Sequence, residues 1–197
     1  NDGLAEPGVA QPDSKTGIST AAYAGDLNGN LWKFDLTSPL GVGSKVFQAV
    51  DKNGTAQPIT SLVALSYDST KGKQSTWALF GTGRYFEDND VTSTQIQTWY
   101  GLRVATDVTG TSAPTVTSIT TQRKDLTERT IVKEDSAGNG NLLRATSPAA
   151  TNDMDGKAGW YMDLSTQSGE RILNRTQFIG GLALVTTMIP KVSDPCN

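Results

Sequence analysis

The strongest constraint on the fold is a strand–turn–strand unit that runs from Tyr23 to Leu36. In its second half Trp32, Phe34 and Leu36 fall on one face, and charged residues fall on the other. This alternation is typical of a half-buried β-strand, because successive side chains of a strand point to opposite faces. The preceding Asn28-Gly29 supplies residues that tolerate positive φ. We therefore predict two antiparallel strands joined by a tight turn.

Strand patterns recur through the rest of the chain. Gly159–Leu164 repeats the alternation, and Ser75–Phe80 is apolar on both faces, which predicts a strand covered on both sides. Further strands are predicted at Ile59–Tyr67, Gln97–Val104 and Phe178–Met188. Turn residues separate the strands at Asn53-Gly54, Lys71-Gly72-Lys73 and Ser168-Gly169.

Helical patterns are nearly absent from the sequence. We expect at most one helical turn, at Ser93–Gln97. The longest apolar run, Gly180–Ile189, is shorter than the roughly 20 residues of a membrane span, and its length predicts a buried strand. No membrane span is therefore expected.

Short strands with recurring glycine and aromatic residues predict an all-β fold and favour the blades of a β-propeller. Two segments rich in Gly, Ser, Thr or Pro interrupt this pattern. We expect Thr106–Thr121 to form a long exposed hairpin or a mobile loop, and Asp135–Asp155 to form a second soft loop. Because scaffold loops often carry recognition, both are expected contact surfaces.

Composition excludes several classes of function. The chain has no histidine, which removes Ser-His-Asp and Cys-His nucleophile systems and His-ligated metals. Cys196 is the single cysteine, so neither a thiolate cluster nor an internal disulfide is expected. The net charge is -3 without a basic run, which argues against binding to nucleic acid. Oxygen-ligated calcium and carboxylate chemistry remain open.

Four motifs in order give the chain a family resemblance. They are Tyr23–Leu36 (YAGDLNGNLWKFDL), Phe80–Phe86 (FGTGRYF), Gln97–Gly101 (QTWYG) after Asp90, and Gly159–Leu164 (GWYMDL) with Gly169–Arg171 (GER). Together they resemble the propeller domain of PilY-type type IV pilus proteins, from about Ala5 to Cys196. The first motif also resembles the repeats of quinoprotein-type propellers.

The PilY-type resemblance implies a quinoprotein-like, modified, roughly seven-bladed β-propeller, of which this chain supplies several blades. Residues 1–197 are expected to be part of a single C-terminal propeller domain with both ends truncated, and a partner of Cys196 is expected to lie beyond the chain. The resemblance also implies export through the periplasm to the outer surface and a place at the pilus tip. Minor pilins and a host cell or abiotic surface are the implied partners.

In this family a calcium loop often precedes the first motif. Here the corresponding stretch is Gln11–Thr20, where Asp13 is the single carboxylate and Lys15 adds an opposing charge. Calcium sites need several oxygen ligands, usually with more than one carboxylate. We therefore expect no tight calcium site and no cofactor in this chain, although calcium remains open for full-length relatives.

Acidic residues offer three candidate sites, each with a structural alternative. Asp26 and Asp35 are either ligands or turn formers, and we favour the turn for Asp26. Glu87-Asp88-Asn89-Asp90 either holds a cation or is a solvated acidic loop, which we favour. Asn152–Gly156 has the spacing of half a calcium loop but lacks downstream ligands, so a plain turn is expected.

Other polar and aromatic residues are also read structurally. Glu170 and Arg171 are expected to form a salt-bridged strand start, and Arg84 is expected to pair across blades. The four tryptophans either form a sugar-binding surface or fill the interfaces between blades, which we favour: Trp32, Trp77, Trp99 and Trp160.

The sequence therefore predicts a binding protein and no enzyme, with no catalytic, cofactor-binding or metal-binding residue assigned. The expected function is pilus assembly and adhesion, in which the protein promotes pilus extension against retraction. Two alternatives remain: a quinone-dependent oxidoreductase propeller and a carbohydrate-binding surface module.

Overall fold

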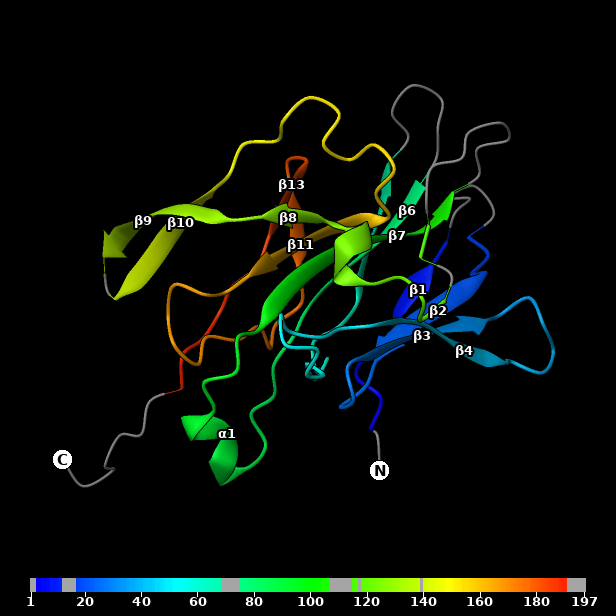
Figure 1. Cartoon of the computed structure of the whole chain (residues 1–197). Helices are drawn as coiled ribbons and strands as arrows, with labels where there is room; N and C mark the ends of the chain where they lie inside the picture. The colour runs from blue at the N-terminus through cyan, green and yellow to red at the C-terminus, as the bar shows by residue number, and fades with distance from the viewer. Residues whose placement is uncertain are drawn as a thin grey trace.

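A computed structural model describes residues 3–11, 17–68, 75–106, 115–116, 118–138 and 140–190. The described chain is nearly all β and is arranged as two larger sheets and two hairpins (Figure 1). The first sheet is an antiparallel meander of four strands: β1 (Gly8–Ala10), β2 (Ala21–Gly25), β3 (Asn30–Asp35) and β4 (Gly43–Gln48).

The second sheet has five strands. Four pair antiparallel in the order β5 (Ala64–Asp68), β6 (Ser75–Gly81), β7 (Thr98–Thr106) and β11 (Gly159–Asp163). The fifth, β8 (Thr127–Arg129), runs parallel to β11 at the edge. Each sheet thus contains the four-stranded antiparallel meander of a propeller blade.

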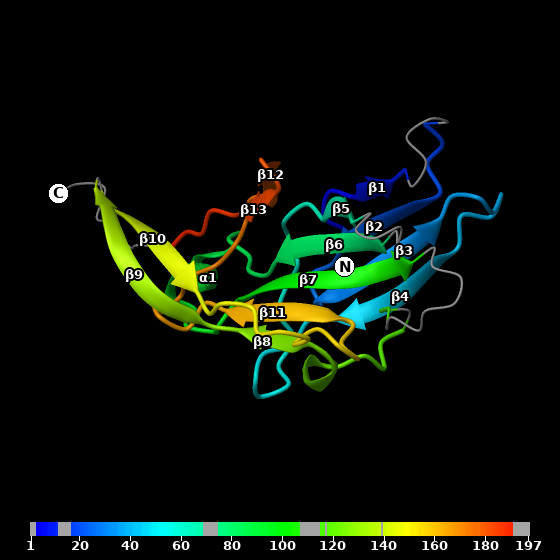
Figure 2. The ribbon, with the colours of Figure 1, turned by 90° about the horizontal axis from the view of Figure 1, so that it is seen from above.

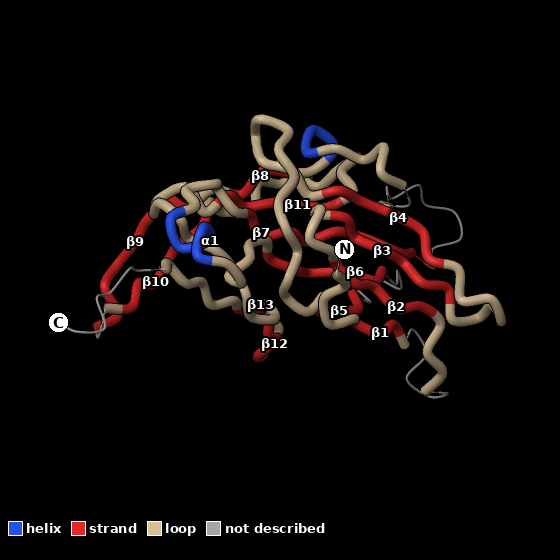
Figure 3. The backbone as a smooth tube through the Cα atoms, turned by 90° about the horizontal axis from the view of Figure 1, so that it is seen from below, coloured by secondary structure: helices blue, strands red, loops and turns tan. Residues whose placement is uncertain are grey.

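Two hairpins complete the strands. The first, β9 (Ile131–Gly138) with β10 (Asn141–Thr146), is inserted between β8 and β11 and projects beyond them (Figure 2). The second is β12 (Gln177–Ile179) with β13 (Leu182–Leu184). Figure 3 shows that the helices in the described part of the chain lie in loops outside the sheets: α1 (Asp88–Thr92) and the 3-10 helix η2 (Arg123–Asp125).

The core lies between the two larger sheets. Phe47 of β4 and Phe80 of β6 each have their ring centre 5.4 Å from that of Tyr100 on β7. The Tyr100 hydroxyl donates to the carbonyl of Val50 or to Oε1 of Gln57, each 3.0 Å away. Burial raises the pKa of Tyr100 to about 12, so the phenol stays neutral and serves as a donor at the sheet interface.

In both larger sheets, a backbone hydrogen bond ties the segment that follows the sheet to the end of the sheet's second strand. After the first sheet, the Ile59 amide donates to the Asp26 carbonyl at 2.9 Å; after the second, the Ile172 amide donates to the Thr82 carbonyl at 3.0 Å. A Cβ added to Gly25 would overlap Ile59, and one added to Gly81 would overlap Ile172. The sequence therefore contains two copies of one unit, each closed by a glycine that packs on an isoleucine.

Most of the predicted strands and turns are confirmed. β2, β3, β6, β7 and β11 lie where the patterns placed them, and Gly29, Gly54 and Gly169 all have positive φ. The face of β3 was misassigned, because Leu31 is fully buried whereas Trp32 and Phe34 are half-buried and Leu36 is exposed. In Ile59–Tyr67, strand structure begins only at Ala64.

Three further predictions are wrong. The helical turn lies at Asp88–Thr92 instead of Ser93–Gln97, because Glu87 and Asp90 form a capping box there. Much of Asp135–Asp155 belongs to the β9–β10 hairpin. Phe178–Met188 is broken by Gly180 and Gly181, both at positive φ, and Leu182 is 65% exposed, so this run is a hairpin and not one buried strand.

Several predicted segments fall partly or wholly outside the described residues. They are Lys71-Gly72-Lys73, most of Thr106–Thr121, the centre of Gln11–Thr20, and Cys196.

The glycine–isoleucine contact can be tested with a double-mutant cycle that uses the two copies of the unit. Gly25→Ala should destabilise the protein by about 1–3 kcal/mol, because the added methyl group overlaps Ile59. Combining it with Ile59→Gly removes both overlapping side-chain atoms, Cγ2 and Cβ, and should cost less than the sum of the two single changes. Urea denaturation of the four proteins measures this coupling.

The second copy supplies the matched control. Gly25→Ala combined with Ile172→Gly should be additive, since Ile172 packs on Gly81 and not on Gly25. Equal coupling in both pairs would show that the contact is not specific.

Candidate functional site

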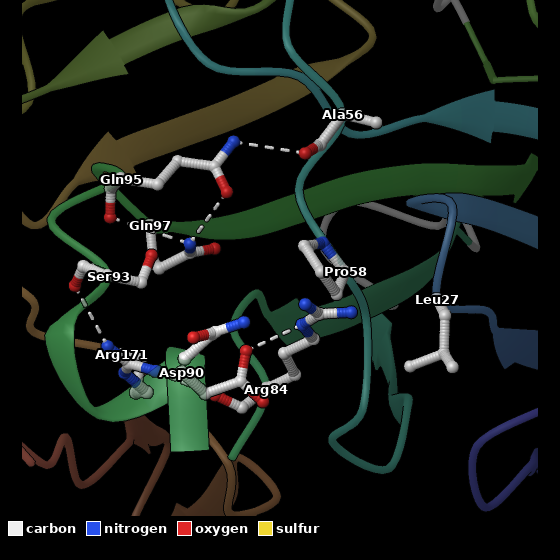
Figure 4. A pocket seen from close by; sticks show the side chains of 10 residues that line it. Leu27, Ala56, Pro58, Arg84, Asp90, Ser93, Gln95, Gln97 and Arg171 are labelled. Atoms are coloured by element: carbon white, nitrogen blue, oxygen red, sulfur yellow. Dashed lines mark hydrogen bonds and ion pairs between the residues drawn. The ribbon is translucent and has the colours of Figure 1, made fainter. Parts of the chain in front are cut away.

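A polar cleft of about 370 Å³ lies between the turn after β2, the connector after β4 and the long segment that joins β6 to β7. Figure 4 shows its lining side chains. They are Leu27, Ala56, Pro58, Arg84, Asn89, Asp90, Ser93, Gln95, Gln97 and Arg171. This volume falls within the range of small-molecule and cofactor pockets.

The two walls of the cleft differ in chemistry. Leu27, Ala56 and Pro58 come from the first unit and its connector, and they are apolar. The opposite wall comes from the segment between β6 and β7 and from Arg171, and it carries charged, amide and hydroxyl groups. The lining that the cleft exposes is mainly polar, so a ligand there would meet mostly hydrogen-bonding groups.

Asp90 organises the polar wall. Its Oδ2 accepts from the backbone amides of Phe86 and Glu87 at 2.9 and 3.1 Å, and its Oδ1 accepts from Nε of Arg84 at 2.7 Å. Burial alone would raise the pKa of Asp90, but these three donors hold it below its ordinary value. The prediction of a solvated acidic loop is thus wrong for Asp90, which is buried and caps α1.

Arg171 ties three segments together through backbone carbonyls. Its guanidinium donates to the carbonyls of Gly169, Arg84 and Ser93 at 2.7–3.1 Å. Burial lowers the pKa of Arg171, and the nearby Asp90 carboxylate partly opposes this effect. The expected pairing of Arg84 across blades takes a different form, because its side chain pairs locally with Asp90 and its carbonyl accepts from Arg171.

A chain of side-chain amides forms the rest of the polar wall. Nε2 of Gln95 donates to Oδ2 of Asp51 at 3.3 Å and to the Ala56 carbonyl at 3.0 Å. Nε2 of Gln97 donates in turn to Oε1 of Gln95 at 3.2 Å. Because the Asp51 carboxylate only accepts, it fixes the orientation of both amides. Oε1 of Gln97 is left buried and without a hydrogen-bond partner among the described residues.

The carboxylates of the first motif serve its turns. Asp26 is buried and accepts from the backbone amides of Asn28 and Asn30, from the Asn30 side chain, and from Nε1 of Trp32 at 2.8 Å. Asp35 accepts from the hydroxyl and backbone amide of Thr37, which lowers its pKa. The prediction that Asp26 forms a turn is confirmed.

The Asn152–Gly156 segment is a turn held by a salt bridge. Asp153 pairs with Arg129 and accepts from the amide of Ala150 at 3.0 Å. The Arg129 guanidinium is the largest cause of the lowered pKa of Asp153. In the described part of the chain, no group of three or more His, Cys, Asp or Glu residues is arranged to hold a metal ion.

Glu170 anchors the projecting hairpin. Its Oε1 pairs with Nη1 of Arg144 on β10, and Nε of the same arginine donates to Glu134 on β9 at 2.6 Å. Glu170 is 1% exposed, and its Oε2 has no hydrogen-bond partner among the described residues. The predicted salt bridge is confirmed for Glu170, whereas Arg171 binds carbonyls.

The tryptophans do not fill the core. All four are half-buried, and the interface between the sheets is filled by Tyr and Phe side chains instead. Trp99 and Trp160 meet edge to face at 5.0 Å within one sheet, while Trp32 and Trp77 lie beneath Lys45 and Arg103. No contact among the described residues favours a shared sugar-binding surface for them.

Sequence reasoning missed the residues that build the cleft by long-range contacts. Gln95 and Asp51 belong to no recognised motif, and the QTWYG motif that begins at Gln97 gave no sign of their contact. The association of the three residues depends on the approach of the first connector to the β6–β7 segment. Among the described helices, none is long and apolar enough to cross a membrane.

Comparisons with known proteins support the family resemblance of the sequence. A model described as the PilY1 beta-propeller domain matches residues 1–139. A type IV pilus biogenesis factor PilY1 homolog of Xylella fastidiosa is 34% identical over 100% of this chain and 15% of its own length. The type IV pilus biogenesis factor PilY1 of Pseudomonas aeruginosa PAO1 is 32% identical over 99% of this chain and 19% of its own length. The chain thus spans less than one fifth of these two relatives.

A solved structure also matches the fold. The crystal structure of the Pseudomonas aeruginosa PilY1 C-terminal domain superposes with a TM-score of 0.74 at 27% identity. The match covers 96% of this chain and 45% of that domain.

The role of Asp90 predicts a pH-dependent stability. Its folded-state pKa lies below the unfolded value of about 3.9, so its contribution is present above that pH and is lost as pH falls through the folded pKa. Asp90→Asn should cost about 1–2 kcal/mol at pH 7 through loss of the charged cap. The difference from the wild type should shrink below about pH 3.9. Urea denaturation at several pH values measures both effects, and a difference that stays constant with pH would contradict them.

Proposed function

The chain belongs to the PilY1 β-propeller family, and from this premise we propose that it acts in type IV pilus biogenesis by binding other proteins and not by catalysis. Family membership confirms the resemblance seen in the sequence, and the all-β blades confirm the expected propeller class. We further propose that residues 1–197 are part of one C-terminal propeller domain.

The finer proposal concerns place and partners. The protein acts at the pilus tip or outer bacterial surface, binds minor pilins and host or abiotic surfaces, and favours pilus extension over retraction. The names of the relatives support the biogenesis role. The structural feature that supports a binding role is the β9–β10 hairpin, which projects from the edge of the second sheet (Figure 2).

The hairpin has one anchored face and one outward face. Strand register places Arg144 opposite Glu134, and both salt bridges of Arg144 lie on this face. Leu143 pairs with Asp135 on the other face and is 63% exposed. An anchored hairpin with an exposed apolar side chain suits a protein contact, because it presents apolar area with little loss of conformational freedom on binding.

This proposal is tested by changing the outward face alone. Leu143→Lys should leave folding intact, since the side chain is exposed and the new cation faces Asp135 across the hairpin, and should reduce the number of surface pili by adding a charge to the contact. Leu40→Lys is the matched control, because Leu40 is 83% exposed in the turn between β3 and β4. Sheared surface pilin is quantified in cells that carry each variant in the complete protein.

Equal piliation by both variants and the wild type would contradict the role of the hairpin. Normal piliation after deletion of the whole gene would contradict the assembly role itself. Gold-labelled antibody tests the location: label concentrated at filament ends supports the tip, and label confined to the cell body contradicts it.

A further inference from the structure

We propose that the β12–β13 hairpin is the first half of a third copy of the unit, and that two further strands of the same protein add to the open edge of β13. This inference rests on the proposal that residues 1–197 are part of one propeller domain, and it does not depend on the pilus role or on the β9–β10 hairpin. Three observations carry it: the register of the hairpin, the exposure of its side chains and the unpaired edge of β13.

The hairpin begins at the same distance from its isoleucine as the second sheet does. β5 begins at Ala64, five residues after Ile59. β12 begins at Gln177, five residues after Ile172. Both isoleucines pack on the glycine that ends the second strand of the preceding sheet. A new strand pair thus starts at a fixed distance after each glycine–isoleucine contact.

The second strand of each pair is also tied back to its connector by the same bond. After β6, the amide of Gly83 donates at 2.7 Å to the carbonyl of Pro58, the residue before the first isoleucine. After β13, the amide of Met188 donates at 2.9 Å to the carbonyl of Arg171, the residue before the second isoleucine. The β12–β13 hairpin therefore holds the same place in its connector as β5 and β6 hold in theirs.

The register of the hairpin is that of the earlier strand pairs. An alanine recurs opposite a larger apolar residue in all three: Val9 with Ala22 in β1–β2, Leu65 with Ala78 in β5–β6, and Phe178 with Ala183 in β12–β13. Leu65 and Phe178 each lie six residues after the isoleucine of their connector. Because a slip of one residue would turn every side chain to the other face, the shared register identifies β12–β13 as a third copy of this strand pair.

Side chains that are buried in the two complete sheets are exposed in the hairpin. Leu184 follows the recurring alanine, as Tyr23 does in β2 and Leu79 does in β6. Tyr23 and Leu79 are buried, whereas Leu184 is 47% exposed. The hairpin thus carries the apolar residues of a blade without the neighbours that cover them in the other two copies.

The edge of β13 lacks the strand that the other copies have there. The strands equivalent to β13 are β2 and β6, and each pairs on its far side with a third strand, β3 or β7. Among the described residues, β13 pairs with β12 alone. A two-stranded hairpin is marginally stable by itself in water, and an open strand edge readily accepts another strand.

The first two copies indicate which strand fits this edge. Phe34 of β3 lies opposite Ala22, and Leu102 of β7 lies opposite Ala78. A large apolar residue therefore pairs with the small side chain of the recurring alanine. The strand that fits β13 runs antiparallel to it and places a large apolar residue opposite Ala183. A fourth strand then completes the meander, as β4 does in the first sheet.

The source of these strands is the protein itself. In the first sheet all four strands follow one another in the sequence. The solved PilY1 C-terminal domain is matched over 45% of its length, so more than half of that domain lies outside the match. A strand of the same chain also has a higher effective concentration at the edge than a strand of a separate protein.

The test measures how fast the new thiol of Leu184→Cys reacts with iodoacetamide, with the modified peptide quantified by mass spectrometry to separate it from Cys196. The reaction should be fast in the 197-residue chain, where Leu184 is exposed. It should be at least about tenfold slower in the purified complete protein, where the added strands cover this position. Leu40→Cys is the matched control and should react equally fast in both proteins, because Leu40 lies in an exposed turn.

A second variant tests the strand edge. The Thr82 amide donates across β6 and β7 to Thr98, and in an antiparallel pair every second amide points the same way, so the Ala78 amide also faces β7. The equivalent Ala183 amide faces the open edge. Ala183→Pro removes this donor, so it should lower the urea midpoint of the complete protein and leave that of the 197-residue chain unchanged.

Three results would overturn the proposal. Equally fast reaction of Leu184→Cys in both proteins would show that nothing covers the hairpin in the complete protein. A slow reaction in the 197-residue chain that becomes fast on dilution would identify a second copy as the occupant. A protected thiol together with an unchanged midpoint for Ala183→Pro would show that the cover is not a paired strand. The pilus role is decided separately by piliation.

Discussion

The contact of a glycine with an isoleucine is the constraint on which the rest of the structure depends. Gly25 packs on Ile59, and Gly81 packs on Ile172, at distances that leave no room for a Cβ. The isoleucine lies in the segment that follows the sheet, and the glycine ends the second strand of the sheet. Their contact therefore makes this segment run back across the end of that strand. The backbone amide of the isoleucine then completes a hydrogen bond to the residue after the glycine. The position of every segment near the cleft depends on this crossing.

The residue two places before each isoleucine, Gln57 or Glu170, makes a different long-range contact in each copy of the unit. Gln57 donates to the Ile96 carbonyl and to Thr98, both at 2.7 Å, and so joins the first connector to the second sheet. Glu170 occupies the corresponding place and pairs with Arg144 of the inserted hairpin. Both side chains are buried, which makes an unpaired partner costly. The buried carboxylate therefore holds in place a hairpin that the basic unit lacks.

Local turn chemistry could be predicted from the sequence, whereas long-range polar contacts could not. Asn28-Gly29 and the groups that donate hydrogen bonds to Asp26 lie within a few residues of Asp26, so the turn was predicted correctly. Gly180-Gly181 also indicated a turn, but the apolar residues on both sides of it led to the prediction of one strand. Asp90 looked like a solvated acid because its burial depends on how the β6–β7 segment folds over it. The β9–β10 hairpin was missed because charged residues fill its first strand.

The cleft arises from an expansion of one turn of the repeated unit. In the first copy Asp26 and Asn30 close a tight turn, with the Asp26 amide bonded to the Asn30 carbonyl at 3.0 Å and the Asn30 amide bonded to the Asp26 carboxylate at 2.8 Å. In the second copy Thr82 and Thr98 make the corresponding two bonds at 3.0 and 2.8 Å, with the Thr82 hydroxyl in place of the carboxylate, but the whole segment 83–97 lies between them. That segment supplies Arg84, α1 and both amides of the relay, while the unexpanded turn supplies Leu27 opposite. Because the closing bonds join equivalent positions in both copies, the added segment changes the surface without disturbing the sheet, which is how a repeated scaffold acquires a site in one copy only.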